Sequence, residues 1–173
     1  MTIINLRQDA TDLRQYLAER VQQQVASKPT EIIHMIQVGF YFTQSGHITV
    51  YFSPEPESYS DGRWTLHIKD QSLFRPTWHE ASSLANANLG QPVTLIQLDG
   101  SETNLAAEIS WEEASKIMLI STGEMIKYVL TYTRDEGLFA TLAKGPSCLF
   151  NLEEFDGGYF WPTGDYKGTD HLL

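Results

Sequence analysis

The side chains best suited to chemistry in this sequence include five histidines, which are scattered along the chain. They are His34, His47, His67, His79 and His171. No two of them have the i, i+4 spacing that places two metal ligands on one face of a helix, and the HExxH motif is absent. His47 and His67 fall on neighbouring expected strands and could meet across a sheet, but an isolated histidine on a strand usually makes a single hydrogen bond. We therefore predict no metal site.

The single cysteine, Cys148, is a candidate nucleophile. A reactive cysteine needs a base or a helix N-terminus that lowers its pKa, and no local motif around Cys148 supplies either. The sequence also lacks a GxSxG elbow and both glycine-rich phosphate-binding motifs. We therefore predict no catalytic residue and no cofactor, and expect Cys148 to pack as a small apolar side chain. A lone cysteine forms no internal disulfide, which favours a reducing cytoplasm.

Carboxylates form the remaining clusters that could do chemistry. Glu112 and Glu113 stand at the expected start of a helix, where negative charge compensates the helix dipole, so they are not an acid/base pair. The acidic run around residues 153–156 lacks the oxygen-ligand spacing of an EF-hand loop. A solvated acidic turn is the simpler interpretation of that run.

The net charge of −10 is concentrated in the C-terminal part of the chain. Residues 99–173 contain thirteen Asp and Glu against five Lys and Arg, or about −8 of the total. This excess argues against direct nucleic-acid binding, because phosphates attract clustered Lys and Arg. It could attract a basic partner such as a toxin, or it could serve solubility alone. The longest apolar runs are far shorter than the roughly 20 residues that span a bilayer, so no membrane association is expected.

Aromatic residues are mixed with the acids in the segment EEFDGGYFWPTGDY, residues 153–166. Tyr and Trp side chains dominate the energetic hot spots of protein interfaces, although many such residues are ordinary core residues. The combination of acids and aromatics in one segment favours a binding surface. We expect partner binding by Glu153, Glu154, Asp156, Tyr159, Trp161 and Asp165.

The scaffold that must position these residues is organised around an antiparallel hairpin at residues 32–52. Two β-branched and aromatic runs flank a polar turn signal at residues 43–46. The first run is apolar on both faces, which is typical of a strand in the middle of a covered sheet. Further strands are expected at residues 63–69, 92–98 and 147–152, whereas residues 101–109 are ambiguous.

Two shorter helices are expected to cover the sheet. Residues 9–27 repeat apolar side chains every four positions, with Asp9 as the N-cap and Pro29 beyond the end. Residues 77–88 indicate a short middle helix that ends in a glycine cap signal.

The clearest helix signal lies near residues 110–133. Ser110 and Glu113 form a capping box, and apolar side chains from there to Tyr132 follow helical spacing. The helix could instead split at Gly123, which costs about 1 kcal/mol relative to alanine. Residues 136–142 suggest a further short helical piece. Together these elements predict one α+β domain over residues 1–173, with a mainly antiparallel central sheet and a loose tail after residue 162.

The order of the elements in this chain resembles that of a known kind of protein. The elements are the covering helix, the hairpin VGFYFTQSGHITVYF, a loop of prolines and acids, a Trp-containing strand and the segment SWEEASKIMLISTGEMIKYVLTYTRDEGLF. They resemble the small α+β proteins, of uncharacterised function, that occur beside bacterial polymorphic toxins as immunity proteins. The resemblance covers residues 10–155 as a pattern and transfers no functional residue. It implies a non-enzymatic cytosolic protein that neutralises a toxin by blocking its active site.

The sequence thus favours a non-enzymatic, immunity-like binding protein that uses acidic and aromatic residues of its C-terminal part. Two alternatives stay open. A small enzyme or ligand-binding domain could assemble a site from dispersed polar residues such as His47, His67, Tyr51 and Glu80. A structural subunit or homodimer could form through an exposed sheet edge.

Overall fold

The computed structural model describes residues 2–41, 46–54, 73–78, 93–105, 110–154 and 159–161. In chain order its elements are β1 (Thr2–Asn5), α1 (Leu6–Ser27), β2 (Ile33–Tyr41), β3 (His47–Ser53), β4 (Leu73–Phe74), β5 (Val93–Ile96), β6 (Glu102–Leu105), α3 (Trp111–Asp135), the 3-10 turn η2 (Leu138–Thr141), β7 (Lys144–Glu154) and β8 (Phe160–Trp161). The α+β class and the mainly antiparallel pairing are confirmed. The strands form two sheets, however, where one had been expected.

The larger sheet has five strands in the order β4-β3-β2-β7-β8, so the hairpin strand β2 lies at its centre as predicted. β2 and β3 pair antiparallel, with Val38 opposite Val50. β7 joins the other side of β2 in parallel, which places Leu152 beside Val38. The expected strand at residues 147–152 is therefore longer than predicted, and it is followed by β8 rather than being the last strand.

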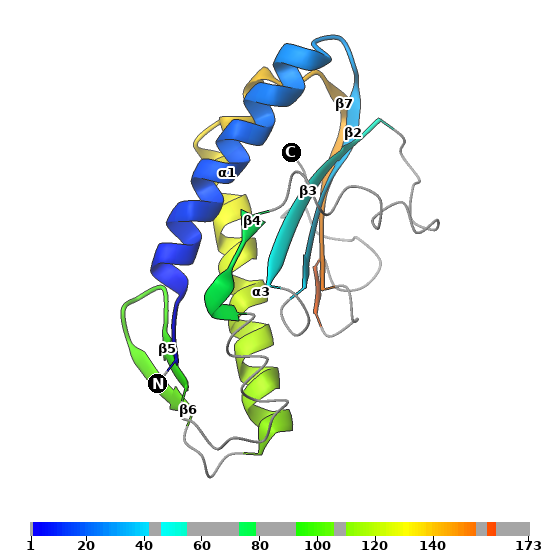
Figure 1. Cartoon of the computed structure of the whole chain (residues 1–173). Helices are drawn as coiled ribbons and strands as arrows, with labels where there is room; N and C mark the ends of the chain where they lie inside the picture. Colours follow the sequence, from blue (N-terminus) through cyan, green and yellow to red (C-terminus); the bar gives the residue numbers. More distant parts are fainter. Residues whose placement is uncertain are drawn as a thin grey trace.

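One face of this sheet forms the apolar core with both long helices (Figure 1). Ile36, Val38 and Phe40 on β2 belong to one buried cluster together with Leu13 of α1 and Met125 of α3. Because strand side chains alternate, the other residues of β2 point to the opposite face. Both described long helices thus cover the same side of the sheet, and the second face carries a different set of side chains.

The smaller sheet has the order β1-β5-β6 and lies near the N-terminal end of α1 (Figure 1). β5 confirms the strand expected at residues 92–98, and β6 occupies part of the ambiguous region. β1 was not anticipated from the sequence; it pairs in parallel with β5, with Ile4 beside Leu95. Ile4 and Leu95 are fully buried and belong to the same apolar cluster as the larger sheet.

Helix α1 starts at Leu6, three residues before the predicted N-cap. Asn5 is the N-cap, and its side chain accepts hydrogen bonds from the backbone N–H groups of Arg7 and Gln8, each at 3.2 Å. The assignment of Asp9 as N-cap is wrong because the residue is 1% exposed and its side chain bonds distant partners instead. The end of the helix at Ser27 is as predicted.

Helix α3 is one continuous helix through Gly123 and confirms the longer of the two alternatives. The Ser110 side chain accepts the N–H of Glu113 at 3.2 Å, as the capping box predicts. The helix continues to Asp135, and the short helical piece expected after it is the 3-10 turn η2. Gly137, with φ of 79°, makes the left-handed turn between them.

Several expectations fall outside the described residues. They are the strand at residues 63–69, most of the middle helix at 77–88 and the tail after residue 162. Of the middle helix, residues 76–78 are described and are helical, beginning at a proline that suits a first helical position. Within the described ranges, no helix is long and apolar enough to cross a bilayer.

Candidate functional site

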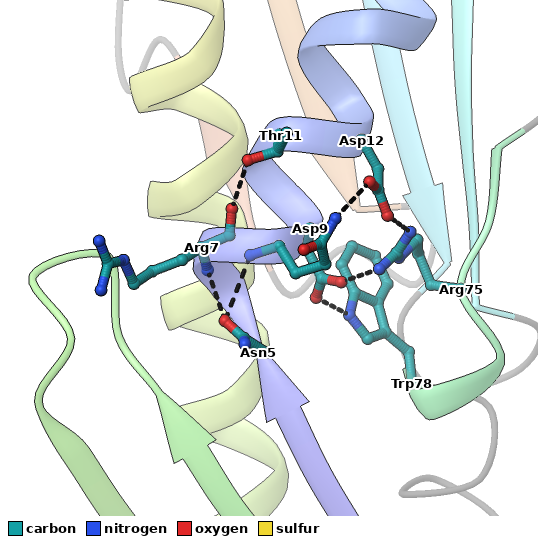
Figure 2. Close-up of polar contacts among 8 residues, drawn as sticks. Asn5, Arg7, Asp9, Thr11, Asp12, Arg75 and Trp78 are labelled. Carbon is teal, nitrogen blue, oxygen red and sulfur yellow. Dashed lines mark hydrogen bonds and ion pairs between the residues drawn. The ribbon is translucent and has the colours of Figure 1, made fainter.

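A buried acid–arginine network ties α1 to the segment after β4 (Figure 2). The Arg75 guanidinium forms ion pairs with Asp9 and, at 2.5 Å, with Asp12. Trp78 donates its indole N–H to the second oxygen of Asp9 at 2.7 Å. The Arg75 side chain is 12% exposed and that of Asp9 is 2% exposed, so this ion pair is largely sealed from solvent, whereas Asp12 is 33% exposed.

The two carboxylates of this network have opposite pKa shifts. Burial raises the pKa of Asp9, and the positive charge of Arg75 offsets only part of that effect. The pKa of Asp12 is lowered: partial desolvation opposes the change, but hydrogen bonds from Arg75 and Gln8 outweigh it. Because Asp9 is almost fully buried and bonds both Arg75 and Trp78, the network fixes the position of residues 75–78. Its sequence signal was the four-residue spacing that places Asp9 on the same helix face as Leu13.

The structure separates the residues expected to bind a partner. Glu153 is partly exposed and Glu154 is 1% exposed, because adjacent residues of β7 point to opposite faces of the sheet. Tyr159 is partly buried, and Trp161 is 7% exposed. Asp156 and Asp165 lie outside the described residues. The four described members thus do not form one continuous exposed surface, and Trp161 packs into the apolar core instead.

Tyr159 and Trp161 pack against the middle of α3. The Tyr159 hydroxyl donates to Glu124 at 2.7 Å, and burial, followed by this contact, raises the pKa of Tyr159. Gly123 permits this approach, because a Cβ there would lie 2.5 Å from the Tyr159 ring. The Lys127 ammonium lies 5.9 Å from the centre of the Trp161 ring, within the range of a cation–π contact. The C-terminal aromatic residues therefore adjoin one particular part of α3.

That part of α3 carries a solvent-facing row with a spacing of four residues, which we term the α3 stripe. It consists of Ile120, Glu124, Tyr128, Tyr132 and Glu136. Ile120, Tyr128 and Tyr132 are 43%, 51% and 41% exposed, and the informative point is that the three lie in one row. The rings of Tyr128 and Tyr132 stack at 5.9 Å. The sequence had placed Tyr132 with the apolar side of the helix, so its exposure corrects that placement.

Helix α1 contributes one cation to the end of the α3 stripe. The Arg14 guanidinium forms an ion pair with Glu136 and lies 5.1 Å from the centre of the Tyr132 ring. A hydrogen bond with Glu136 raises the pKa of Tyr132, so its hydroxyl stays protonated at neutral pH. The stripe therefore presents two aromatic rings held in place by neighbours, with carboxylates on both sides of the pair. The signal was present in the sequence as the i, i+4 repeat from Ile120 to Glu136.

The remaining candidate residues are Cys148 and the histidines. Cys148 is 2% exposed, and burial raises its pKa to about 11, so it remains a thiol at neutral pH. The ring of His47 lies 5.0 Å from that of Phe74, and His34 packs beside Gly145. His67 lies outside the described residues, so its position relative to His47 is untested. Among the residues described, no group of three or more His, Cys, Asp or Glu could hold a metal ion.

Comparisons with protein-family models, curated proteins and solved structures give no match for this sequence.

Proposed function

We propose that this chain is a non-enzymatic, cytoplasmic protein-binding protein of the immunity type, and that the α3 stripe is the centre of its binding surface. The observation that carries the proposal is the exposure of Tyr128 and Tyr132 as a stacked pair on a helix whose opposite side is buried in the core. Solvent-exposed aromatic pairs of this kind are typical anchors of protein interfaces.

The chemistry of the stripe favours a basic protein as the partner. Glu124 and Glu136 stand at either end of the Tyr128–Tyr132 pair, and Glu112 and Glu113 extend the exposed acids toward the helix start. The charge of about −8 over residues 99–173 adds a field of the same sign. Complementary charge accelerates encounter and disfavours acidic competitors, whereas desolvated aromatic rings supply affinity. A toxin with a basic active site is a partner of this chemistry.

Affinity capture tests the proposal on the full chain. The immobilised protein is exposed to lysate of its source organism at about 50 mM and about 300 mM NaCl, and retained proteins are identified by mass spectrometry. We expect a basic protein to be retained at low salt and released at high salt. With that protein purified, Tyr128→Ala should weaken its affinity about tenfold or more, as measured by calorimetry. Glu124→Lys should slow association and reduce the salt dependence.

Two exposed positions elsewhere provide matched controls. Glu19→Lys makes the same charge reversal on α1, and Ile32→Ala removes a side chain that is 53% exposed outside the stripe. Both should retain the affinity of the unmodified chain. The proposal fails if the stripe variants bind as tightly as these controls, or if binding does not respond to salt. Light scattering should show a monomer; a dimer abolished by Tyr128→Ala would mean that a second copy occupies the stripe instead.

A further inference from the structure

Helix α1 lies beside α3 and sends one charged side chain, Arg14, onto the exposed side of that helix (Figure 1). The Arg14 guanidinium ion-pairs with Glu136, which is 122 residues away in the sequence. It also lies 5.1 Å from the centre of the Tyr132 ring. The Tyr132 ring stacks on that of Tyr128, with 5.9 Å between the centres and 19° between the planes. A series of contacts thus connects α1 to both exposed tyrosines of the α3 stripe.

The ion pair between Arg14 and Glu136 is too exposed to stabilise the fold strongly. The two side chains are 51% and 39% exposed, and exposed ion pairs are weak because solvent screens them and two long side chains must be ordered. The same contacts restrict Tyr132 from two directions, since Glu136 also accepts a hydrogen bond from its hydroxyl. An exposed ring that is already held in place loses less conformational entropy when a partner covers it. The position of Arg14 therefore benefits binding more than folding.

The acids on the exposed side of α3 differ in how their charge is compensated. Three acids in the middle and at the end of the helix each pair with a cation of this chain: Glu124 with Lys127, Asp135 with Arg134, and Glu136 with Arg14. At the start of the helix, Glu112 and Glu113 are exposed and form no ion pair with any residue that the structure describes. The uncompensated negative charge of α3 therefore lies at its start.

We propose that Arg14 orients the partner on the α3 stripe: it holds the tyrosine pair for apolar contact and neutralises Glu136, so that the partner's cations lie toward Glu112 and Glu113. The role of Arg14 rests on the protein-binding function proposed for the stripe and is that of a positioning residue. A guanidinium suits this role because its planar group pairs with a carboxylate and stacks on an aromatic ring, which an ammonium group does less well.

The charge pattern defines the surface that such a partner must present. The rise of 1.5 Å per helical residue puts Glu113 roughly 22 Å from Tyr128 along the axis of α3. A fitting partner therefore has an apolar patch for the tyrosine pair and a basic patch about 20 Å to one side of it.

NMR of the tyrosine rings tests the positioning role without any partner. Full-length protein with 13C-labelled tyrosine rings is compared with Arg14→Met and Arg14→Lys. Arg14→Met should shift the ring resonances of Tyr128 and Tyr132 toward those of unstructured tyrosine, because the stacked geometry is no longer held. It should also raise the pKa of Tyr132, since the positive charge of Arg14 lowers it. Arg14→Lys should restore the pKa and only part of the ring shifts. Tm should fall by no more than about 4 °C.

Binding kinetics test the orientation with the basic protein that affinity capture retains. In about 100 mM NaCl the Debye length is roughly 10 Å, so charges farther apart than this are largely screened. Removing two charges at the helix start, by Glu112→Gln with Glu113→Gln, should therefore slow association about threefold or more. Removing two charges at the helix end, by Asp135→Asn with Glu136→Gln, makes the same change in net charge. It should change the association rate less than about twofold.

Dissociation of the same complex reports on Arg14 itself. Arg14→Met should speed dissociation about fivefold or more, because the partner must then order the tyrosine pair on binding. Arg7→Met is the charge-matched control, since Arg7 is another exposed residue of α1 and lies beside Gly100. It should leave both the dissociation rate and the ring resonances unchanged.

The outcomes separate the role of Arg14 from the binding function on which it rests. Arg14 has no positioning role if Arg14→Met leaves the tyrosine resonances or the dissociation rate unchanged. The orientation is wrong if the two double variants slow association equally. Either result, together with weakened binding by Tyr128→Ala, overturns this inference and leaves the proposed function intact. If Tyr128→Ala binds as tightly as the unmodified chain, or if no basic protein is retained, the proposed function itself fails.

Discussion

At the scale of single residues, the stability of the described structure depends strongly on the charge of Arg75. Its guanidinium is the cation that faces the buried Asp9 carboxylate, and it also binds Asp12. Removing one partner of a buried ion pair leaves an uncompensated charge, which costs about 3–5 kcal/mol. We therefore expect Arg75→Met to lower the free energy of unfolding by about 3–5 kcal/mol at pH 7 in urea denaturation. Asp9→Asn should cost less, because burial already favours the neutral form and the amide oxygen can still accept from Trp78.

The pH dependence provides the second readout of this prediction. A carboxyl whose pKa is higher in the folded state than in the unfolded state stabilises the fold at low pH and loses that contribution as the pH rises through the folded-state pKa. Without Arg75, the pKa of Asp9 should rise further. The stability deficit of Arg75→Met should therefore shrink as the pH is lowered toward 4, and a deficit that stays constant would contradict the account. Arg14→Met is the control, because its ion pair with Glu136 is exposed and contributes about 1 kcal/mol or less.

At the scale of elements, the middle of α3 contains Gly123, a residue type that helix propensity alone disfavours. Replacing Gly123 by alanine should stabilise an isolated helix by about 1 kcal/mol. In this fold the new Cβ would lie 2.5 Å from the Tyr159 ring, so Tyr159 would have to move and its bond to Glu124 would break. We expect Gly123→Ala to destabilise the protein by about 1–3 kcal/mol.

A double-mutant cycle in urea isolates that contact. With Tyr159→Ala already present, the clash is gone and Gly123→Ala should become stabilising. If Gly123→Ala stabilises the protein in both backgrounds, the packing of Tyr159 on α3 is not what the structure indicates. The matched comparison is Ser121→Ala, a partly exposed position of α3 that should change little in either background.

The elements that the sequence predicts well are those encoded by local signals. The hairpin has two β-branched and aromatic runs with a polar turn signal between them, and α3 begins with a capping box whose bond from Glu113 to Ser110 forms as expected. The elements that were missed depend on distant partners. β1 is four residues long and exists through its pairing with β5 about ninety residues later. Asp9 resembles a helix cap locally, and only its long-range contact with Arg75 shows why it is buried.

The candidate sites follow the same division. The α3 stripe was present in the sequence as an i, i+4 repeat but was overlooked, because Tyr132 had been placed with the apolar side of the helix. The row of polar side chains around Gln37 on the larger sheet could not be derived from the sequence, because it requires the register of three strands. In particular, β7 lies in parallel beside β2, so that Asn151 and Glu153 become neighbours of Gln37 and Gly39.

At the scale of the whole molecule, the two sheets should behave as one cooperative unit. A single apolar cluster includes Ile4 and Leu95 of the smaller sheet as well as Val38 of the larger one. Because these residues share one buried core, opening the smaller sheet would expose side chains that also support the larger sheet. This is the physical basis for expecting one domain over residues 1–173.

Native-state hydrogen exchange in increasing guanidinium chloride measures that cooperativity directly. Amides of β5 and β2 should converge on one opening free energy with one denaturant slope. Ile4→Ala should lower the opening free energy of both strands equally, by about 2–5 kcal/mol, since it leaves a cavity in the shared core. Val38→Ala is the reciprocal variant and should affect β5 as strongly as β2. If Ile4→Ala accelerates exchange in β5 alone while β2 keeps its protection, the smaller sheet opens by itself and the chain comprises two independent units.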